Sequence, residues 1–178
     1  MALNRTVQLK KIRDEIWNLS KSPLYNYRKK NNYFPVIGEG NHFSKIIFIG
    51  EAPGQREAET GRPFCGAAGK ILDELLVSID LKRKDVYITN VVKDRPPNNR
   101  DPEPEEIKLY SPFLDRQILI IKPKIIATLG RFSTKYILEK FNLGKTKIIP
   151  LYHPAVVLYS AGSRKVLEED FRILKDLV

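Results

Sequence analysis

The sequence predicts an α/β protein: a three-layer α/β/α sandwich around a central four-stranded parallel sheet. Four short runs of nearly continuous apolar residues are typical of strands buried on both faces, as in parallel sheets. These runs alternate with segments whose apolar residues recur at helical spacing, which indicates covering helices. With 178 residues and no internal repeat, low-complexity tract or linker in the sequence, we expect one domain over residues 1–178.

The N-terminal part of the chain predicts a helix and then a loop. Leu9, Ile12, Ile16 and Leu19 fall on one helical face, which indicates an amphipathic helix. Residues 23–33 follow as a basic loop rich in tyrosine. Both segments precede the first apolar run.

Two strands and two helices make up the middle of the chain. The strand at 45–50 is followed by a helix over 69–80, whose leucines and isoleucine lie on the inner side. The strand at 86–92 leads into a proline-dense turn over 95–104, from which a helix continues to Ile121. Glutamates at the start of this helix suit the positive end of its dipole.

The C-terminal part repeats the alternation. A strand at 124–130, a helix over 133–141, a strand at 147–152 and a closing helix over 162–178 are expected. Strands that alternate with helices in this way pair in parallel, and ligands of such sheets bind beyond the carboxyl ends of the strands.

Polar residues stand where three of the predicted strands end. Glu51 lies in the glycine-rich segment 50–54 after the first strand, Asn90 lies at the end of the second, and His153 follows the last. Their convergence at one edge of the sheet indicates a site. Each has a plainer alternative: Asn90 caps a strand end, Glu51 is a solvated turn residue, and a lone histidine is usually structural.

Composition limits the class of partner. Lys and Arg number 31 against 21 Asp and Glu, a formal net charge of +10, which favours a polyanion although a lysine-rich solvated surface would give the same count. One cysteine forms no internal disulfide, and with two histidines it makes a poor metal site. No run approaches the roughly 20 apolar residues of a membrane span, and the first residues are no secretory signal. We therefore expect an intracellular, cytoplasmic protein without a membrane partner.

Two glycine-containing segments carry the remaining signals. Segment 50–54 is not a dinucleotide fingerprint, and it lacks the Lys-Ser/Thr end of a phosphate loop. Segment 61–69 places small residues just ahead of a helix, where backbone N–H groups attract anions. An isolated Phe64 is more often a core residue than a platform for a ligand, but its place between Pro63 and Gly66 in a polar loop argues against a core position.

Five motifs in order make the chain similar to a known family. They are Gly50-Glu51-Ala52-Pro53-Gly54 with Glu57, Gly61-Arg62-Pro63-Phe64-x-Gly-x-Ala-Gly, Ile88-Thr89-Asn90-Val91-Val92-Lys93, Arg95-Pro96-Pro97-Asn98-Asn99-Arg100 and His153-Pro154-Ala155. From about Leu19 to the C-terminus, the chain resembles the family-four uracil-DNA glycosylases. The resemblance implies a DNA-repair enzyme that hydrolyses the N-glycosidic bond of uracil in DNA and leaves an abasic site.

The resemblance also implies roles for the residues at the strand ends. Phe64 would stack on a uracil flipped out of the helix, and Asn90 would read its edge through its amide. His153 would donate to O2 of the departing base, and Glu51 would orient or deprotonate the attacking water.

Further positions would contact the base or the DNA. Glu57 would crowd the C5 position, where thymine carries a methyl group, and the backbone at Ala52 would help hold the base. Val157 and Leu158 would fill the gap left in the DNA. The expected phosphate contacts are Lys93, Arg95, Arg100 and Arg164.

The chain departs from the family at the iron–sulfur cluster. Most members hold a four-iron cluster through four cysteines, and these positions are Leu19, Ser22, Asp94 and Tyr110 here. Cys65 lies in the base-binding loop and cannot substitute. We predict no cluster and no cofactor, with Leu19 and Tyr110 filling the space by packing while Asp94 and Ser22 form hydrogen bonds.

Two smaller departures concern DNA contacts. The segment between Leu143 and Ile149 is shorter than in most members, and Tyr159 stands where many have a basic residue. Two alternative functions stay open: excision of another deaminated base such as hypoxanthine or xanthine, and damaged-DNA binding without catalysis. We expect a monomer whose partner is uracil-containing DNA.

Overall fold

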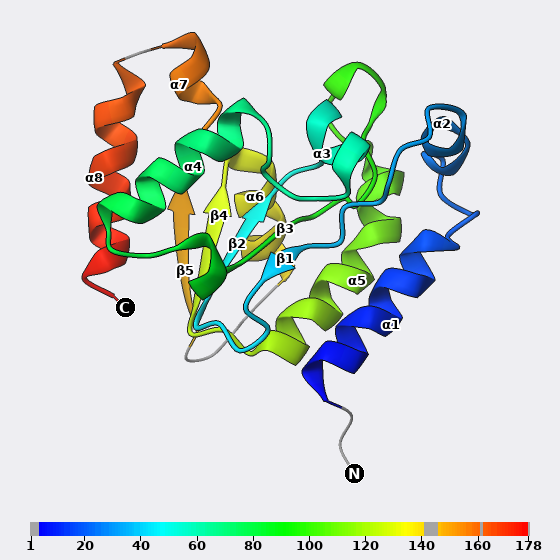
Figure 1. Cartoon of the computed structure of the whole chain (residues 1–178), viewed down its shortest axis with the longest axis horizontal. Helices are drawn as coiled ribbons and strands as arrows, with labels where there is room; N and C mark the ends of the chain where they lie inside the picture. The colour runs from blue at the N-terminus through cyan, green and yellow to red at the C-terminus, as the bar shows by residue number, and fades with distance from the viewer. Residues whose placement is uncertain (1–3, 141–145, 161, 178) are drawn as a thin grey trace.

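A five-stranded sheet forms the middle layer of the molecule. The computed structural model describes residues 4–140, 146–160 and 162–177 (Figure 1). The strands are β1 (Glu39–Gly40), β2 (Ile46–Gly50), β3 (Tyr87–Asn90), β4 (Ile125–Leu129) and β5 (Lys147–Leu151). Their order is β1-β3-β2-β4-β5, and all neighbouring pairs are parallel except β1 with β3.

The prediction of four parallel strands is correct for β2 to β5 but misses β1. This strand has two residues, so it carries no alternation that a sequence pattern could reveal. It pairs antiparallel with β3, where Glu39 lies opposite Ile88 and Gly40 opposite Tyr87. The sheet is therefore mixed, with one short antiparallel strand at its edge.

Helices cover both faces of this sheet and complete the three-layer sandwich. They are α1 (Arg5–Trp17), α2 (Tyr25–Lys30), α3 (Gln55–Thr60), α4 (Ala67–Ser78), α5 (Pro104–Ile121), α6 (Arg131–Lys140), α7 (Val156–Tyr159) and α8 (Ser163–Lys175). α4 and α8 pack on one face, and α1, α5 and α6 pack on the other (Figure 1).

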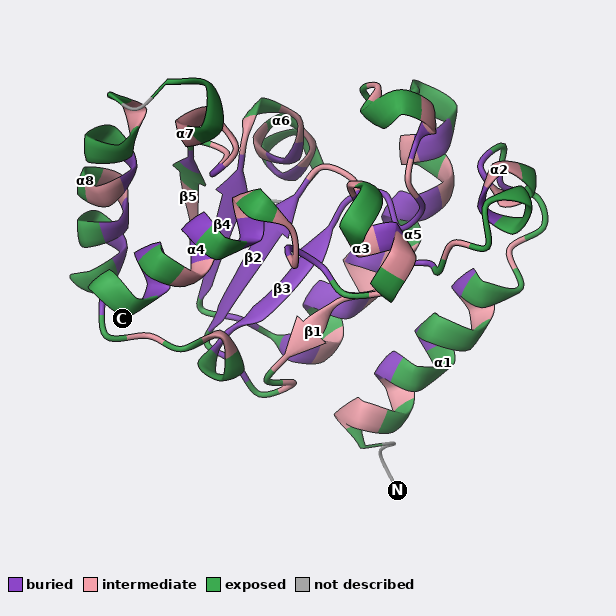
Figure 2. Ribbon diagram, turned by 45° about the horizontal axis from the view of Figure 1, so that its top comes forward, coloured by how far each residue is buried: buried purple, intermediate pink, exposed green. Residues whose placement is uncertain are grey.

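The central strands are apolar at successive positions because both of their faces are covered. Ile46 and Phe48 of β2 point into the core beneath α4 and α8, whereas Ile47 and Ile49 point into the core beneath α1 and α5. β2, β3 and β4 are buried along their whole length (Figure 2). This double burial is the reason that the strands read as continuous apolar runs.

The shortest helices were not predicted. α2 lies inside the segment expected to be a loop, and α3 and α7 are too short to show a helical period. The first helix ends at Trp17, so Leu19 lies beyond it but still packs against the core of α1 and α5. Residues 141–145 lie outside the described residues, as does the expected shortening there. Within the described ranges, no helix combines the length and apolar character needed to cross a membrane.

Candidate active site

The carboxyl ends of the strands and the loops beyond them enclose a cavity of about 340 Å³. Six residues predicted from the sequence line it, and four others join them. The lining residues are Glu51, Ala52, Gly54, Glu57, Phe64, Ala68, Asn90, Asn99, His153 and Ala155. The strand-end convergence expected from the sequence is therefore present.

Asn90 forms the buried end of the cavity. Its residue is only 1% exposed, and its Oδ1 has no hydrogen-bond partner among the residues that the structure describes. Leaving a buried polar oxygen unpaired costs about 1–3 kcal/mol, so such an atom in a cavity is suited to a ligand that donates a hydrogen bond.

Gly50 lets this amide and an aromatic ring approach the same strand end. Gly50 is the register partner of Asn90 across β2 and β3. A Cβ atom at position 50 would collide with Asn90 Oδ1 and lie 2.7 Å from Cζ of Phe64. Only glycine leaves room for both side chains.

Phe64 lies in the loop between α3 and α4 with an unusual backbone. Its φ is 48°, in the left-handed region that bulky residues avoid. Its ring lies 5.5 Å from that of His153, at an interplanar angle of 33°. Phe64 is only 6% exposed and packs into the core beneath α4 and α8 as well as lining the cavity, so the expectation that it lies outside the core is wrong. The ring is held there at the expense of local strain.

His153 presents a hydrogen-bond donor to the cavity. Its Nδ1 accepts a hydrogen bond of 3.1 Å from the Ala155 N–H, so the proton of the neutral ring lies on Nε2. Burial lowers the pKa of His153, and the Glu57 carboxylate opposes this shift only in part. The ring is therefore neutral near pH 7, with Nε2–H free to donate.

Glu51 has the chemistry of a proton acceptor. Burial raises the pKa of Glu51 to about 7; the negative charge of Asp101 raises it further, and Arg131 lowers it. A carboxyl group with this pKa exchanges a proton near neutral pH, as a general base must. Such shifted groups are commonest at functional sites.

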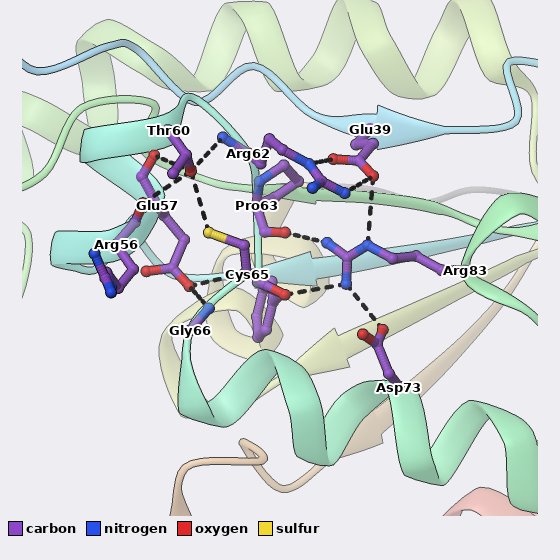
Figure 3. Close-up of polar contacts among 11 residues, drawn as sticks. Glu39, Arg56, Glu57, Thr60, Arg62, Pro63, Cys65, Gly66, Asp73 and Arg83 are labelled. Carbon is purple, nitrogen blue, oxygen red and sulfur yellow. Dashed lines mark hydrogen bonds and ion pairs between the residues drawn. The ribbon is translucent and has the colours of Figure 1, made fainter.

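Glu57 has a structural contact that the sequence did not reveal. Its Oε1 accepts hydrogen bonds from the N–H groups of Cys65 at 3.1 Å and Gly66 at 3.0 Å (Figure 3). The carboxylate thus shapes the loop that carries Phe64 while it also lines the cavity.

The family of the chain can be assigned from these features together with its sequence. The model of the uracil DNA glycosylase superfamily matches residues 37–176. The chain belongs to this superfamily. The matched range includes every strand of the sheet and every residue of the cavity.

Relatives within the superfamily are similar over most of the chain. A type-4 uracil-DNA glycosylase of Sulfurisphaera tokodaii is 48% identical over 95% of this chain and 84% of the relative. One of Archaeoglobus fulgidus is 44% identical over 92% of this chain and 89% of the relative. A type-5 uracil-DNA glycosylase of Thermus thermophilus is 32% identical over 63% of this chain and 58% of the relative.

The four positions at which most of the family holds an iron–sulfur cluster do not fit one here. Tyr110 donates a hydrogen bond of 2.6 Å to Asp94 Oδ2, and its hydroxyl also lies 2.7 Å from Ser22 Oγ. Leu19 packs against the core of α1 and α5. The predicted packing and hydrogen bonds are confirmed. None of the four side chains supplies a thiolate, and the described residues contain no group of three or more His, Cys, Asp or Glu that could hold a metal ion.

Arg28 completes this network, and no pattern in the sequence indicated its role. Its Nη1 donates to both oxygens of Asp94 at 3.1 Å, and its guanidinium also donates to the carbonyls of Ile16 and Trp17. Arg28 and Asp94 form an ion pair with both side chains buried. Side chains that are 66 residues apart in the chain thus join Ser22 and Tyr110 in one buried network.

The expected DNA wedge lies on α7. Leu158 is 51% exposed and Tyr159 is 89% exposed, whereas Val157 packs partly against the core beneath α4 and α8. Exposed apolar side chains beside the cavity suit the predicted insertion, and Leu158 and Tyr159 offer more surface for it than Val157 does.

Of the basic residues expected at phosphates, Lys93 is a wrong prediction. It is fully buried, and its Nζ donates to Thr89 Oγ1, the Asn90 carbonyl and Gln117 Oε1 at 2.6–2.7 Å. The prediction rested on its place at the strand-end face of the sheet, but residues 91–94 are all buried there. Lys93 therefore stabilises the backbone of Asn90 through a hydrogen bond to its carbonyl.

The three arginines are accessible but already have partners. Arg95 donates to Tyr33 and Asn99, and Arg164 pairs with Glu74 and Glu168. Their phosphate contacts stay a prediction.

Arg100 binds the buried Glu106 through two hydrogen bonds, and its side chain is 36% exposed. Its main contact thus fastens the start of α5. A role at a phosphate stays a prediction for it as well.

Proposed function

We propose that this chain is a DNA-repair glycosylase that hydrolyses the N-glycosidic bond of uracil in DNA and leaves an abasic site. One observation carries the proposal: the buried amide oxygen of Asn90, which has no hydrogen-bond partner within the described part of the chain, lies in the same cavity as the Phe64 ring and the His153 donor. The names of the relatives, type-4 and type-5 uracil-DNA glycosylases, support the same substrate.

Recognition of the base follows from the Asn90 amide. Uracil presents an acceptor at O4 and a donor at N3–H, and one side-chain amide can donate to the first and accept from the second. Cytosine presents the reverse pattern and would leave the buried Oδ1 without a donor. Phe64 stacks on the face of the flipped base, as aromatic rings do in enzymes of this kind.

The leaving group is stabilised by His153. Negative charge grows on the uracil O2 as the bond to the sugar breaks, and a hydrogen bond from Nε2–H strengthens as it does. A neutral ring is sufficient for this role because it donates without transferring a proton. The hydrogen bond from the Ala155 N–H fixes the tautomer in advance.

Glu51 acts on the attacking water. Its carboxylate orients the attacking water, accepts its proton and favours positive charge on the sugar. The reaction needs only water and placed charges, so we propose no cofactor.

DNA is bound through phosphates by the excess of positive charge, and Leu158 enters the helix as the base leaves. We propose that the protein acts as a monomer in the cytoplasm, at the nucleoid, without a membrane partner.

A strand-cleavage assay tests the proposal. An end-labelled oligonucleotide with one uracil, single-stranded or opposite G or A, is incubated with protein and then treated with alkali. We expect breakage at the uracil, none at cytosine or thymine, and loss of breakage in Asn90→Ala and His153→Ala. Intact uracil strands, with breakage at hypoxanthine or xanthine instead, would redirect the proposal to another deaminated base. Tight binding without breakage at any base would indicate a lesion-binding protein.

A further inference from the structure

The loop that carries Phe64 is held on one side by Arg83, a residue outside the cavity (Figure 3). Arg83 Nη1 donates a hydrogen bond of 3.0 Å to the Phe64 carbonyl, and Nη2 donates to the Pro63 carbonyl. The guanidinium thus binds two successive carbonyls of the loop.

Two carboxylates hold this guanidinium in place. Asp73 Oδ1 of α4 accepts a hydrogen bond of 3.0 Å from Arg83 Nη1, and Glu39 Oε1 of β1 lies 3.5 Å from Nε. The Arg83 side chain is 18% exposed. Its orientation is therefore set by the sheet edge and by the helix that follows the loop.

Glu57 holds the next part of the loop through a carboxylate that accepts hydrogen bonds from backbone N–H groups, whereas Arg83 donates to backbone carbonyls. Its carboxylate accepts from the N–H groups of Cys65 and Gly66, directly after the carbonyls that Arg83 binds. Together the two side chains bind one backbone group on each of four successive residues, two carbonyls and two N–H groups, between α3 and α4.

This double attachment explains how Phe64 keeps a left-handed backbone. A positive φ at an aromatic residue persists only when its surroundings fix it, since an extended backbone is more stable for a free loop. A relaxed loop would turn the ring away from Gly50 and His153, which now lie against it.

We propose that Arg83 is a positioning residue for base excision, which holds the Phe64 ring at its stacking position through the carbonyls of Pro63 and Phe64. The inference rests on the proposed function, because it takes Phe64 as the platform for the base. The planar fork of the guanidinium donates hydrogen bonds to two carbonyls and one carboxylate and forms an ion pair with a second carboxylate, an arrangement that an ammonium group cannot match.

Kinetics on the uracil oligonucleotide test this role with a matched control. Arg62 also binds Glu39, by hydrogen bonds of 2.8 and 2.9 Å, but its described side-chain contacts do not include the loop carbonyls. We expect Arg83→Gln and Arg83→Lys to lower kcat/KM by about tenfold to a hundredfold, and Arg62→Gln by less than about threefold. Thermal unfolding of each variant verifies that it is folded at the assay temperature.

A double-mutant cycle separates positioning from general stability. If Arg83 acts through the ring, Arg83→Gln should change kcat/KM by less than about threefold in a Phe64→Ala background. Equal losses in both backgrounds would overturn the proposal, as would an Arg83→Gln effect no larger than that of Arg62→Gln.

Cys65 reports on the loop without any activity. It is the single cysteine of the chain and follows Phe64 directly. Its rate of alkylation by iodoacetamide should rise several-fold in Arg83→Gln and Arg83→Lys but not in Arg62→Gln, because the loop opens more often. Unchanged alkylation in both Arg83 variants would overturn the proposal. The two proposals fail separately. If the wild-type protein leaves uracil intact but alkylation is still faster in the Arg83 variants, the proposed function is refuted and the attachment of the loop is not.

Discussion

At the scale of single residues, the cavity combines a glycine, an amide, a ring and two ionisable groups whose properties depend on close neighbours. The sequence indicated these residues because each follows a strand end or belongs to a motif. It did not indicate the unpaired state of Asn90 or the direction of the pKa shifts, because burial and contacts across the fold determine both.

The raised pKa of Glu51 predicts the pH dependence of excision. The carboxylate is the active form, so kcat/KM should rise about tenfold per pH unit below about 7 and level off above it. Single-turnover rates from pH 5 to 9 measure this, and Glu51→Gln should abolish the rising limb. A wild-type profile that is flat from pH 5 to 8 would exclude Glu51 as the base.

The space at Gly50 predicts a severe effect of one methyl group. Gly50→Ala should reduce excision by about a hundredfold or more, because the added Cβ displaces both Asn90 and Phe64. Overpacking should also lower the free energy of unfolding by about 1–3 kcal/mol. Gly162→Ala is the control, since nothing lies within 4 Å of a Cβ there. Near wild-type activity of Gly50→Ala would contradict the crowded arrangement.

At the scale of elements, apolar patterns predicted the long strands and helices but not the pieces that complete the site. α3 and β1 supply Glu57 and Glu39, yet each is too short to show a period. Arg28 and Lys93 are buried, which a sequence position alone does not indicate because charged residues are usually exposed. Their partners come from distant segments, so only the fold brings them together.

The buried pair of Arg28 and Asp94 predicts a stability effect. Asp94→Asn should lower the free energy of unfolding by about 3–5 kcal/mol, because it leaves the Arg28 charge buried without compensation. Arg28→Met combined with Asp94→Asn should recover part of this loss. Urea denaturation measures each variant. Asp14→Asn is the control, because Asp14 pairs with Arg13 on the surface, and it should lower the free energy of unfolding by less than about 1 kcal/mol. An equally small loss for Asp94→Asn would show that the buried network contributes little to stability.

The same network predicts independence from iron. Protein purified without added metal should contain no stoichiometric iron and show no visible absorption band, because Ser22, Asp94 and Tyr110 bind one another. Treatment with a chelator should leave Tm and excision unchanged. Stoichiometric iron measured by mass spectrometry, with loss of Tm on chelation, would refute this expectation.

At the scale of the whole molecule, the net charge of +10 is spread over many side chains, and two of the arginines expected at phosphates, Arg100 and Arg164, are paired with carboxylates. Attraction to DNA is therefore a property of the surface more than of one residue. We expect the affinity for a uracil-containing duplex to fall about tenfold or more between 50 and 200 mM salt. Fluorescence anisotropy measures this, and the single-turnover rate at saturating protein should stay constant. An affinity independent of salt would contradict electrostatic binding.

The pairing of Gly50 with Asn90 places the amide proposed to read the base in the buried central layer of the molecule. Gly50 and Asn90 are the last residues of two buried parallel strands. We therefore expect the part of the cavity that they form, its floor, to be ordered before DNA binds. A preorganised floor loses little conformational entropy on binding, and its dipoles need no rearrangement when charge develops. Because Arg83 and Glu57 also hold the Phe64 loop, we expect the entropy lost on binding to fall on α7. Leu158 and Tyr159 of α7 are exposed, and we expect the protein to adapt to the shape of the DNA there.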